Sequence, residues 1–223
     1  LLLYEALLDS NLVYYLIKCL RVCEGHMNLV YGIGVNSGEY PAKVGGKHTK
    51  QYKLWQGMLS RCTEKVWNER PTYTGTTCSD NFKSYTFFYE WCQQQLGFIN
   101  KDENSRCWHL DKDLLTKGNK VYSEDTCVFV PHRINLLLIK RDASRGDWPV
   151  GVSWRKKAEK FEASCSTGSK SQHLGFFDTP QEAFLAYKTF KEALIKEVAE
   201  DYKDQVDSRL YQALLDYRVE ITD

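Results

Sequence analysis

The stretches GVSWRKKAEKFEASC (residues 151–165) and HLGFFDTPQEAFLAY (residues 173–187) decide the fold of the C-terminal part of the chain. They contain three strand candidates separated by turn-rich segments: Gly151–Lys156, Lys160–Ser164 and His173–Phe177. Thr179, Pro180 and Glu182 form a capping box with proline at the first helical position, so a helix is expected to begin there. One face of this helix carries Ala183, Ala186, Tyr187 and Phe190. The sequence therefore predicts a small three-stranded antiparallel sheet packed on one helix.

The same stretch resembles the APETALA2-type DNA-binding domain of plant transcription factors, which also occurs in phage homing endonucleases. The matching positions are Gly151-Val152, Phe161 with Ala163, Leu174-Gly175-x-Phe177-x-Thr179, Glu182-Ala183 and Ala186-Tyr187. In that family the sheet lies in the major groove of DNA, and its exposed strand residues contact bases and phosphates. The resemblance implies duplex-DNA contacts from Ser153, Trp154, Arg155, Lys157, Lys160, Ser164 and Ser166. Ser153 replaces one of the arginines that the family usually carries here.

A second unit lies upstream, in WHLDKDLLTKGNKVYSEDTCVFVPHRIN, residues 108–135. Its pattern predicts a strand over Cys107–Asp111, a polar loop, a second strand over Thr126–Val130 and a helix after Pro131. Proline suits the first turn of a helix because its missing N–H is not needed there.

This unit resembles the HNH nucleases, whose site is a ββα-metal unit, and especially a group of small tailed-phage proteins described as HNH or homing endonucleases. Asp111 matches the metal-binding aspartate, Asn119 the loop asparagine and Asn135 the ligand on the helix. Lys112 stands in place of the general-base histidine, and Thr126 in place of the central asparagine. The resemblance implies one Mg²⁺ or Mn²⁺ and hydrolysis of a phosphodiester bond.

The missing histidine leaves two roles open. His109, Asp111 and Asp113 alternate, so an extended strand would direct all three toward one face. Either His109 replaces the missing base, or Asp113 joins Asp111 and Asn135 as a metal ligand. The candidate catalytic residues are therefore His109, Asp111, Lys112, Asn119 and Asn135. A lysine is protonated at pH 7 unless it is buried, so Lys112 is a poor base and favours a nuclease scaffold without activity.

The segment 27–70 is basic, with seven Lys or Arg against three Asp or Glu. Its glycine-rich start predicts turns and short strands, and Lys43, Lys47, His48 and Lys50 are candidates for contacts with the DNA backbone. Helical spacing of apolar residues indicates one helix around Trp55–Cys62 and another over Asn81–Gln94, with their aromatic side chains in the core.

Residues 1–26 are apolar, but Glu5, Asp9 and Lys18 interrupt them, so we expect an extension extraneous to function rather than a membrane span. Cys19, Cys23 and His26 lack a fourth ligand nearby. The chain's eight cysteines include no paired C-x-x-C, and the spacing of Cys62, Cys78, Cys92 and Cys107 fits no zinc pattern. Reduced thiols in a bacterial cytoplasm, during phage infection or lysogeny, are therefore expected.

These patterns predict an α+β chain: the extension 1–26, an HNH-like domain over 27–145 with flanking helices, an APETALA2-type domain over 146–200 and an acidic helical tail over 201–223. Because the net charge of the whole chain is only +1, DNA binding must come from local charge. The preferred interpretation is a phage or prophage endonuclease acting on duplex DNA. The alternatives are a DNA-binding protein with an inactive HNH scaffold and a protein whose basic face binds an acidic partner. The pattern implies no membrane partner and no small-molecule cofactor, and it leaves the oligomeric state unknown.

Overall fold

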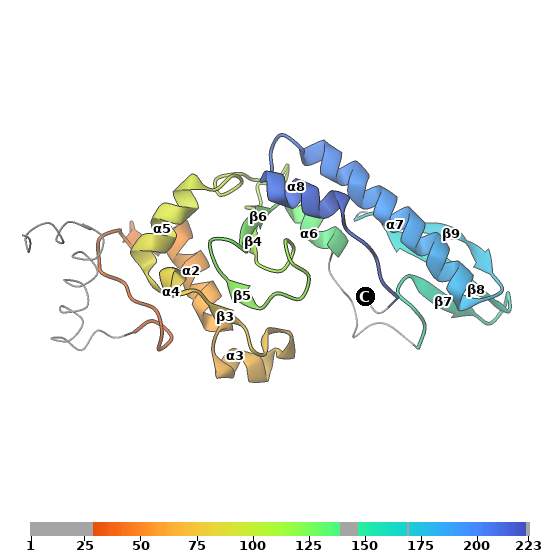
Figure 1. Ribbon diagram of the computed structural model, residues 1–223, viewed down its shortest axis with the longest axis horizontal. Coiled ribbons are helices and arrows are strands. Elements are labelled where there is room, and N and C mark those ends of the chain that lie inside the picture. The colour runs from red at the N-terminus through yellow and green to blue at the C-terminus, as the bar shows by residue number, and fades with distance from the viewer. Residues whose placement is uncertain (1–28, 139–146, 169, 222–223) are drawn as a thin grey trace, which may run out of the picture.

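A computed structural model describes residues 29–138, 147–168 and 170–221 of the chain. It shows the expected mixed α+β architecture, with small sheets and helices spread along an elongated molecule (Figure 1). The predicted extension 1–26, with Cys19, Cys23 and His26, lies outside the described residues, as does the predicted boundary between residues 145 and 146. None of the helices in the described part of the chain is long and apolar enough to cross a membrane.

The C-terminal module contains the predicted sheet. Strands β7 (Val152–Arg155), β8 (Lys160–Ser166) and β9 (Ser171–Phe177) pair antiparallel in the order β7-β8-β9. The apolar residues Phe161, Ala163 and Cys165 alternate along β8 and are buried. The other face of the sheet is open to solvent. The three predicted strands are present, but β7 is one residue shorter at each end, β8 continues two residues further and β9 begins two residues earlier than expected.

The helix that covers this sheet is α7 (Pro180–Tyr202), and its predicted start is confirmed. Thr179 Oγ1 accepts from the Glu182 amide at 3.3 Å, and the Glu182 side chain accepts from the Thr179 amide at 3.2 Å. These two bonds satisfy backbone donors that the first helical turn otherwise leaves unpaired. The N-terminal half of α7 contributes the buried Ala183 and Tyr187, which belong to the small cores of the sheet.

The N-terminal part is built around aromatic helices. A hairpin of β1 (Lys43–Val44) and β2 (Lys47–His48) leads into α2 (Lys50–Arg61), α3 (Glu64–Glu69), the 3₁₀ turn η1 (Pro71–Tyr73) and β3 (Thr77–Cys78), which pairs with β5 (Val121–Tyr122). The single helix expected over Asn81–Gln94 is two helices, α4 (Asp80–Lys83) and α5 (Tyr85–Gln94). Ser84 separates them because its extended backbone and side-chain oxygen cap α5, accepting from the Phe87 amide at 3.3 Å. The predicted core aromatics Phe82, Tyr85 and Phe88 are fully buried.

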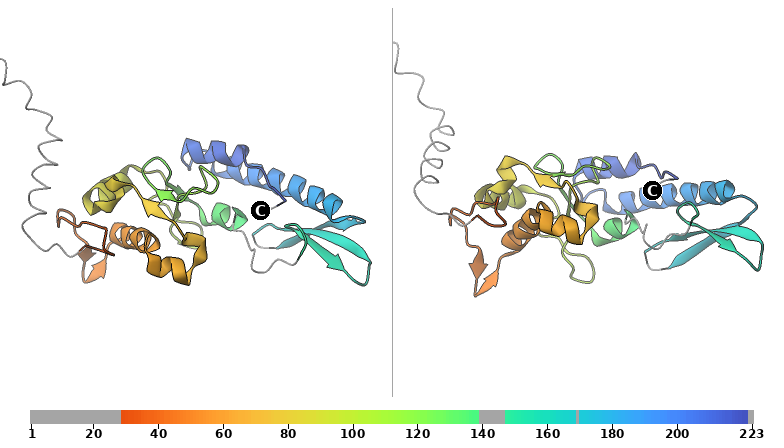
Figure 2. Two further views of the ribbon diagram at one scale, coloured as in Figure 1. Left: turned by 60° about the horizontal axis from the view of Figure 1, so that its bottom comes forward. Right: turned by 90° about the horizontal axis from the view of Figure 1, so that it is seen from below.

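The C-terminal half of α7 enters this N-terminal core. Ile195, Val198 and Ala199 share one hydrophobic cluster with Trp55, Phe129 and Ile134. Helix α8 (Ser208–Leu215) packs against α7 and buries Leu210 and Leu214 in the same cluster. Figures 1 and 2 show α7 running from the sheet at one end of the molecule to α6 and α8 near its middle. The acidic tail expected over 201–223 therefore exposes its charged side chains but has an apolar face that belongs to the core.

Candidate functional site

The second predicted unit contains two strands and a helix in the expected order. β4 (His109–Asp111) and β6 (Val128–Val130) pair antiparallel, with His109 opposite Val130 and Asp111 opposite Val128, and α6 (His132–Leu138) follows. Both strands begin two residues later than expected. We call β4, β6 and α6, with the loop between the strands, the ββα unit. Its order agrees with the HNH pattern, while its membership in that family stays a prediction.

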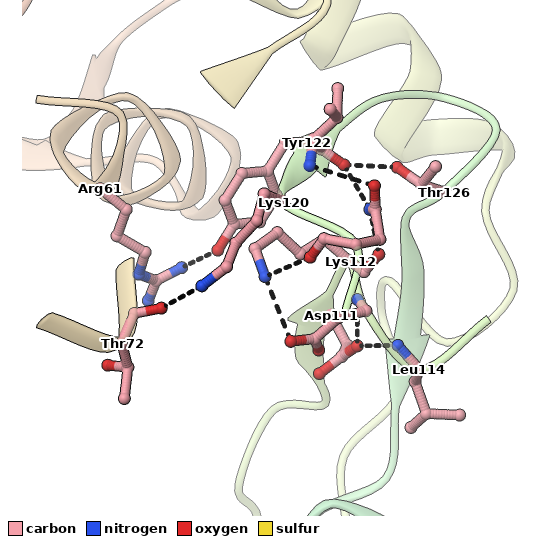
Figure 3. A network of polar contacts seen from close by, with 11 residues as sticks. Arg61, Thr72, Asp111, Lys112, Leu114, Lys120, Tyr122 and Thr126 are labelled. Carbon is pink, nitrogen blue, oxygen red and sulfur yellow. Dashed lines mark hydrogen bonds and ion pairs between the residues drawn. The ribbon is translucent and has the colours of Figure 1, made fainter. Parts of the chain in front are cut away.

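Asn119 and Thr126 hold the loop between these strands together. Asn119 Nδ2 donates to the backbone oxygens of Lys112 at 2.6 Å and Val121 at 2.8 Å. Thr126 Oγ1 donates to the same Val121 oxygen at 2.7 Å and accepts from the Ser123 amide at 3.1 Å. Asn119, predicted among the catalytic residues, thus stabilises the loop. Thr126, at the motif position of the central asparagine, supplies a further hydrogen bond to the same loop (Figure 3).

Lys112 is buried, with only 6% of its surface exposed. Its ammonium donates to Asp113 Oδ2 at 3.2 Å and to the backbone oxygen of Asn119 at 3.1 Å, and it lies 5.6 Å from the centre of the Tyr122 ring (Figure 3). An ammonium that pairs with a carboxylate remains charged and has no lone pair with which to accept a proton. Lys112 therefore acts as a structural cation under the loop, and this arrangement does not support a role as general base.

Asp111 lies at the end of β4 and is largely buried. Its Oδ1 accepts from the amides of Asp113 at 3.0 Å and Leu114 at 2.9 Å. Burial, followed by the negative charge of Asp113, raises the pKa of Asp111 from its usual 3.8 to about 6. The strand stops at Asp111, so the expected alternation does not extend to Asp113. A turn held by these two hydrogen bonds brings Asp113 beside Asp111 instead.

His109 and Asn135 meet across the ββα unit. Asn135 Nδ2 lies 2.9 Å from His109 Nδ1. Burial, together with the neighbouring His132 and Arg106, lowers the pKa of His109 below its usual 6.5. The His109 and His132 rings are 5.3 Å apart, and His132 Nδ1 is buried without a hydrogen-bond partner among the described residues. His109 is therefore neutral at pH 7, as a general base requires.

Two neighbouring pockets open at this point. One, of about 610 Å³, is lined by His109, Asp111, Asp113 and Asn135 together with Lys53 and Arg61 of α2. The other, of about 1270 Å³, lies toward α8 and is lined by Asp111, Asp113 and Asn135 as well. The structure thus brings together five of the residues that the sequence singled out: His109 and Asp111 of β4, Lys112 and Asp113 just after it, and Asn135 of α6.

The donor set is compatible with a divalent metal ion. Mg²⁺ is usually held by one or two carboxylates and several waters. Asp111 and Asp113 supply two carboxylates whose mutual repulsion helps to raise the pKa of Asp111, so a cation between them would be stabilised. Among the described residues, no three His, Cys, Asp or Glu side chains form a ready-made metal cluster. The two carboxylates are donors of the kind that a hydrated Mg²⁺ accepts.

The four cysteines considered for zinc occupy different environments. The thiols of Cys62 and Cys78 are hydrogen-bonded to each other, which raises the pKa of Cys62 and lowers that of Cys78. Cys92 is fully buried in the core, and Cys107 is exposed on a loop. No zinc site is proposed from them.

The open face of the sheet carries five of the seven DNA contacts predicted for the C-terminal module, namely Ser153, Arg155, Lys160, Ser164 and Ser166. Strand register places Ser153 opposite Glu162 and Arg155 opposite Lys160, so these four side chains share one face. Trp154 pairs with Phe161 and packs on its ring at 4.8 Å, which places it toward the helix side, where 39% of its surface remains exposed. Ser164 and Ser166 continue the open face along β8, and Ser166 is exposed.

Glu162 is the residue of this face that sequence reasoning missed. Its carboxylate pairs with the Arg155 guanidinium on one side and with His173 Nδ1, at 2.8 Å, on the other. Burial alone would raise the pKa of Glu162, but the hydrogen bonds from Arg155 and His173 outweigh it and lower that pKa. Strand register identifies it, because the residue that pairs with Ser153 on the neighbouring strand must lie on the same face of the sheet.

The lysines predicted to contact DNA differ in their exposure and in their partners within the protein. Lys43 and Lys47 are exposed on the β1–β2 hairpin, and Lys157 is exposed at the turn between β7 and β8. Lys160 pairs with Asp178 at 2.9 Å. Lys50 departs from the expectation, because its ammonium donates to the backbone oxygen of Phe98 and lies 4.6 Å from the centre of that ring. It is thus occupied within the protein.

No protein-family model, no curated protein and no solved structure matches this chain.

Proposed function

We propose that the chain is a duplex-DNA endonuclease that holds DNA on the open face of the β7–β9 sheet and hydrolyses a phosphodiester bond at the ββα unit. The observation that carries this proposal is the convergence of His109, Asp111, Asp113 and Asn135 on one pocket at the end of β4. A neutral imidazole, two carboxylates and an amide are the groups that metal-assisted hydrolysis of a phosphodiester requires.

His109 is the general base in this proposal. With Asn135 Nδ2 at its Nδ1, the neutral ring carries its proton on Nε2. A half-turn of the Asn135 amide presents Oδ1 to the ring instead, so that the proton moves to Nδ1 and Nε2 becomes able to accept one from water. Asn135 is then a positioning residue that selects the reactive tautomer of His109.

Asp111 and Asp113 are the residues that would hold Mg²⁺, with the side-chain oxygen (Oδ1) of Asn135 beside them. When bound, the ion supplies positive charge at the scissile phosphate. Asp111 Oδ1 accepts hydrogen bonds from two backbone amides, which fix the orientation of the carboxylate. These two bonds do not use the other carboxylate oxygen, Oδ2. Lys112 keeps Asp113 in place and offsets part of the negative charge that would otherwise repel the phosphate.

In this proposal, the β7–β9 sheet binds the duplex DNA. Arg155 uses its Nε for the pair with Glu162, so both terminal amino groups of its guanidinium remain for a base edge or a phosphate. Lys157 adds an exposed charge next to it. Replacing Arg155 by alanine should lower duplex affinity about 5- to 100-fold, the range for loss of one base contact, as measured by fluorescence anisotropy. Unchanged affinity would place the DNA elsewhere.

The decisive test is the nicking of supercoiled plasmid with Mg²⁺ or Mn²⁺. Wild type should nick the plasmid, whereas Asp111→Asn and His109→Ala should each lose at least about 100-fold in rate. Asp111→Asn retains an oxygen for the two backbone amides, so its fold is preserved. Lys65→Gln, at an exposed position outside both pockets, should retain the activity of the wild type. An inactive wild type that still binds duplex DNA would exclude hydrolysis.

A specific observation favours a second candidate, a DNA-binding protein without hydrolytic activity. Lys112 occupies the position of the general base and is buried against Asp113 and Asn119. In this alternative, the ββα unit is a scaffold stabilised by an internal lysine in place of a metal ion. Equal melting temperatures with 5 mM EDTA and with excess Mg²⁺ would favour it, because a ligand that binds only the folded state raises that temperature.

A further inference from the structure

The two pockets at the ββα unit share part of their lining. Both are lined by Tyr73, Asp111, Asp113 and Asn135, so the carboxylate pair lies at the junction between them. One pocket extends from this junction toward α2, and the other extends toward α8 and the segment that follows it. We call the combined depression the basic groove.

Positive charge is present on both sides of the junction. Seven Lys or Arg side chains line the basic groove against four carboxylates. On the α2 side these are Lys53 and Arg61, with Lys112 beneath, and on the α8 side they are Lys117, Lys120, Arg209 and Arg218. Such a distribution attracts a polyanion along the length of the groove rather than at one point.

Several of these cations have hydrogen bonds that fix their direction. Lys120 donates to the backbone oxygen of Thr72 at 2.6 Å, and Arg209 pairs with Asp207 at 3.0 Å. Arg218 donates to the backbone oxygens of Tyr217 at 2.9 Å and Leu215 at 3.4 Å, and its guanidinium, whose charge also acts on Glu192, is exposed. Lys53 is exposed on α2. Each end of the groove therefore has a cation available to a phosphate.

We propose that the basic groove holds one sugar-phosphate strand of the DNA, which enters along α2, passes over Asp111 and leaves along α8. The proposal rests on the proposed function and adds a binding surface to it. It assigns a role to the predicted tail: although residues 201–223 are acidic overall, Arg209 and Arg218 project into the groove. Neither these arginines nor Lys53 was a predicted DNA contact.

The test measures binding of a 20-base-pair duplex in EDTA, so that it is independent of catalysis. Lys53→Gln and Arg218→Gln remove one charge at opposite ends of the groove. Each should weaken binding about 3- to 10-fold near 0.1 M salt and reduce the slope of log affinity against log salt by about one. The double variant should reduce that slope by about two. Circular dichroism melts check that each variant is folded.

Lys65→Gln and Lys196→Gln are the matched controls, because they remove the same charge from exposed positions outside both pockets. They should change affinity less than about twofold. An effect at one end alone, or an equal effect of the controls, would overturn the continuous groove. If the groove variants lose affinity as expected while wild type fails to nick plasmid, the endonuclease proposal fails and the groove stands. If wild type nicks the plasmid but both groove variants bind DNA as wild type does, the groove proposal fails and the endonuclease proposal stands.

Discussion

The β7–β9 sheet and the ββα unit expose their functional side chains in different ways. In the sheet, Ser153, Arg155 and Glu162 lie on regular strands, and alternation together with register gives the direction of each side chain. In the ββα unit, Asp113 follows the end of β4 and is directed by a turn, while Lys112 and Asn119 are joined by hydrogen bonds across seven residues. A contact surface is therefore encoded by a short repeat, whereas this candidate site depends on one particular loop conformation.

The largest expected effects come from one glycine beside each region. Gly97 has φ +84°, and a Cβ there would lie 2.3 Å from the Trp108 ring; Gly151 has φ +77°, and a Cβ would lie 2.1 Å from the Tyr187 ring. Replacing either by alanine should lower the free energy of unfolding by about 3 kcal/mol or more, since steric overlap adds to the cost of the left-handed backbone. Urea denaturation followed by circular dichroism measures it.

Gly118→Ala is the control for these variants, because φ is +82° but nothing lies within 4 Å of the added atom. Its expected loss is only about 1–2 kcal/mol. The number of unfolding transitions then shows whether the two regions unfold together. Because α7 belongs to both cores, each variant should unfold in one transition. A separate early transition in Gly151→Ala alone would show that the sheet folds independently.

The next effect concerns the buried lysine. Lys112→Met retains most of the side-chain volume but removes the charged hydrogen bonds to Asp113 and the Asn119 oxygen, and should cost about 2 kcal/mol of unfolding free energy. Lys117→Met, at a half-exposed lysine whose distance to Glu220 is 3.9 Å, should cost less than about 0.5 kcal/mol. A more stable Lys112→Met protein would mean that desolvation of the ammonium outweighs its bonds.

A smaller effect depends on pH. The pKa of Asp111 is about 6 in the folded chain against the usual 3.8, so its ionisation disfavours folding. This group's contribution to stability is fully present below pH 3.8 and is lost as the pH rises through about 6. In EDTA, Asp111→Asn should thus be more stable than wild type by about 1–2 kcal/mol at pH 7.5, with a smaller difference at pH 4.5. A difference that is the same at both pH values would contradict the raised pKa.

The smallest effect is expected on the open sheet. Glu162→Gln removes a negative charge from the proposed DNA-facing surface but retains one acceptor oxygen for Arg155, while its amide nitrogen can donate to His173 Nδ1. Duplex affinity should rise about two- to fivefold, and the free energy of unfolding should fall by less than about 1 kcal/mol. Anisotropy titrations against duplex DNA measure the first effect. Weaker binding would indicate instead that the carboxylate orients Arg155 for DNA.

The sequence predicted the sheet, the capped helix and the strand–loop–strand–helix order because each depends on local signals. Thr179 and Glu182 are three residues apart, and the three sheet strands have clear turns between them. It also singled out His109, Asp111, Asp113 and Asn135, which line one pocket.

Other features depended on tertiary contacts that no local pattern contains. The position of Lys50 against Phe98, 48 residues away, could not be read from its basic surroundings. The hydrogen bond between His109 and Asn135 likewise joins residues 26 apart. The broken helix at Ser84 was missed because apolar spacing continues across the break, although serine itself is a common N-cap.

If the chain is the endonuclease proposed above, helix α7 sets a distance along its DNA. Its 23 residues form an uninterrupted rod whose ends are embedded in two different cores. At 1.5 Å per residue it is about 35 Å long, close to one full turn of B-form DNA. An enzyme built on such a rod would recognise one sequence and cut at a constant offset from it. The recognised bases and the cut bases would then be separate, so mutations at the cut position of a target would leave recognition intact.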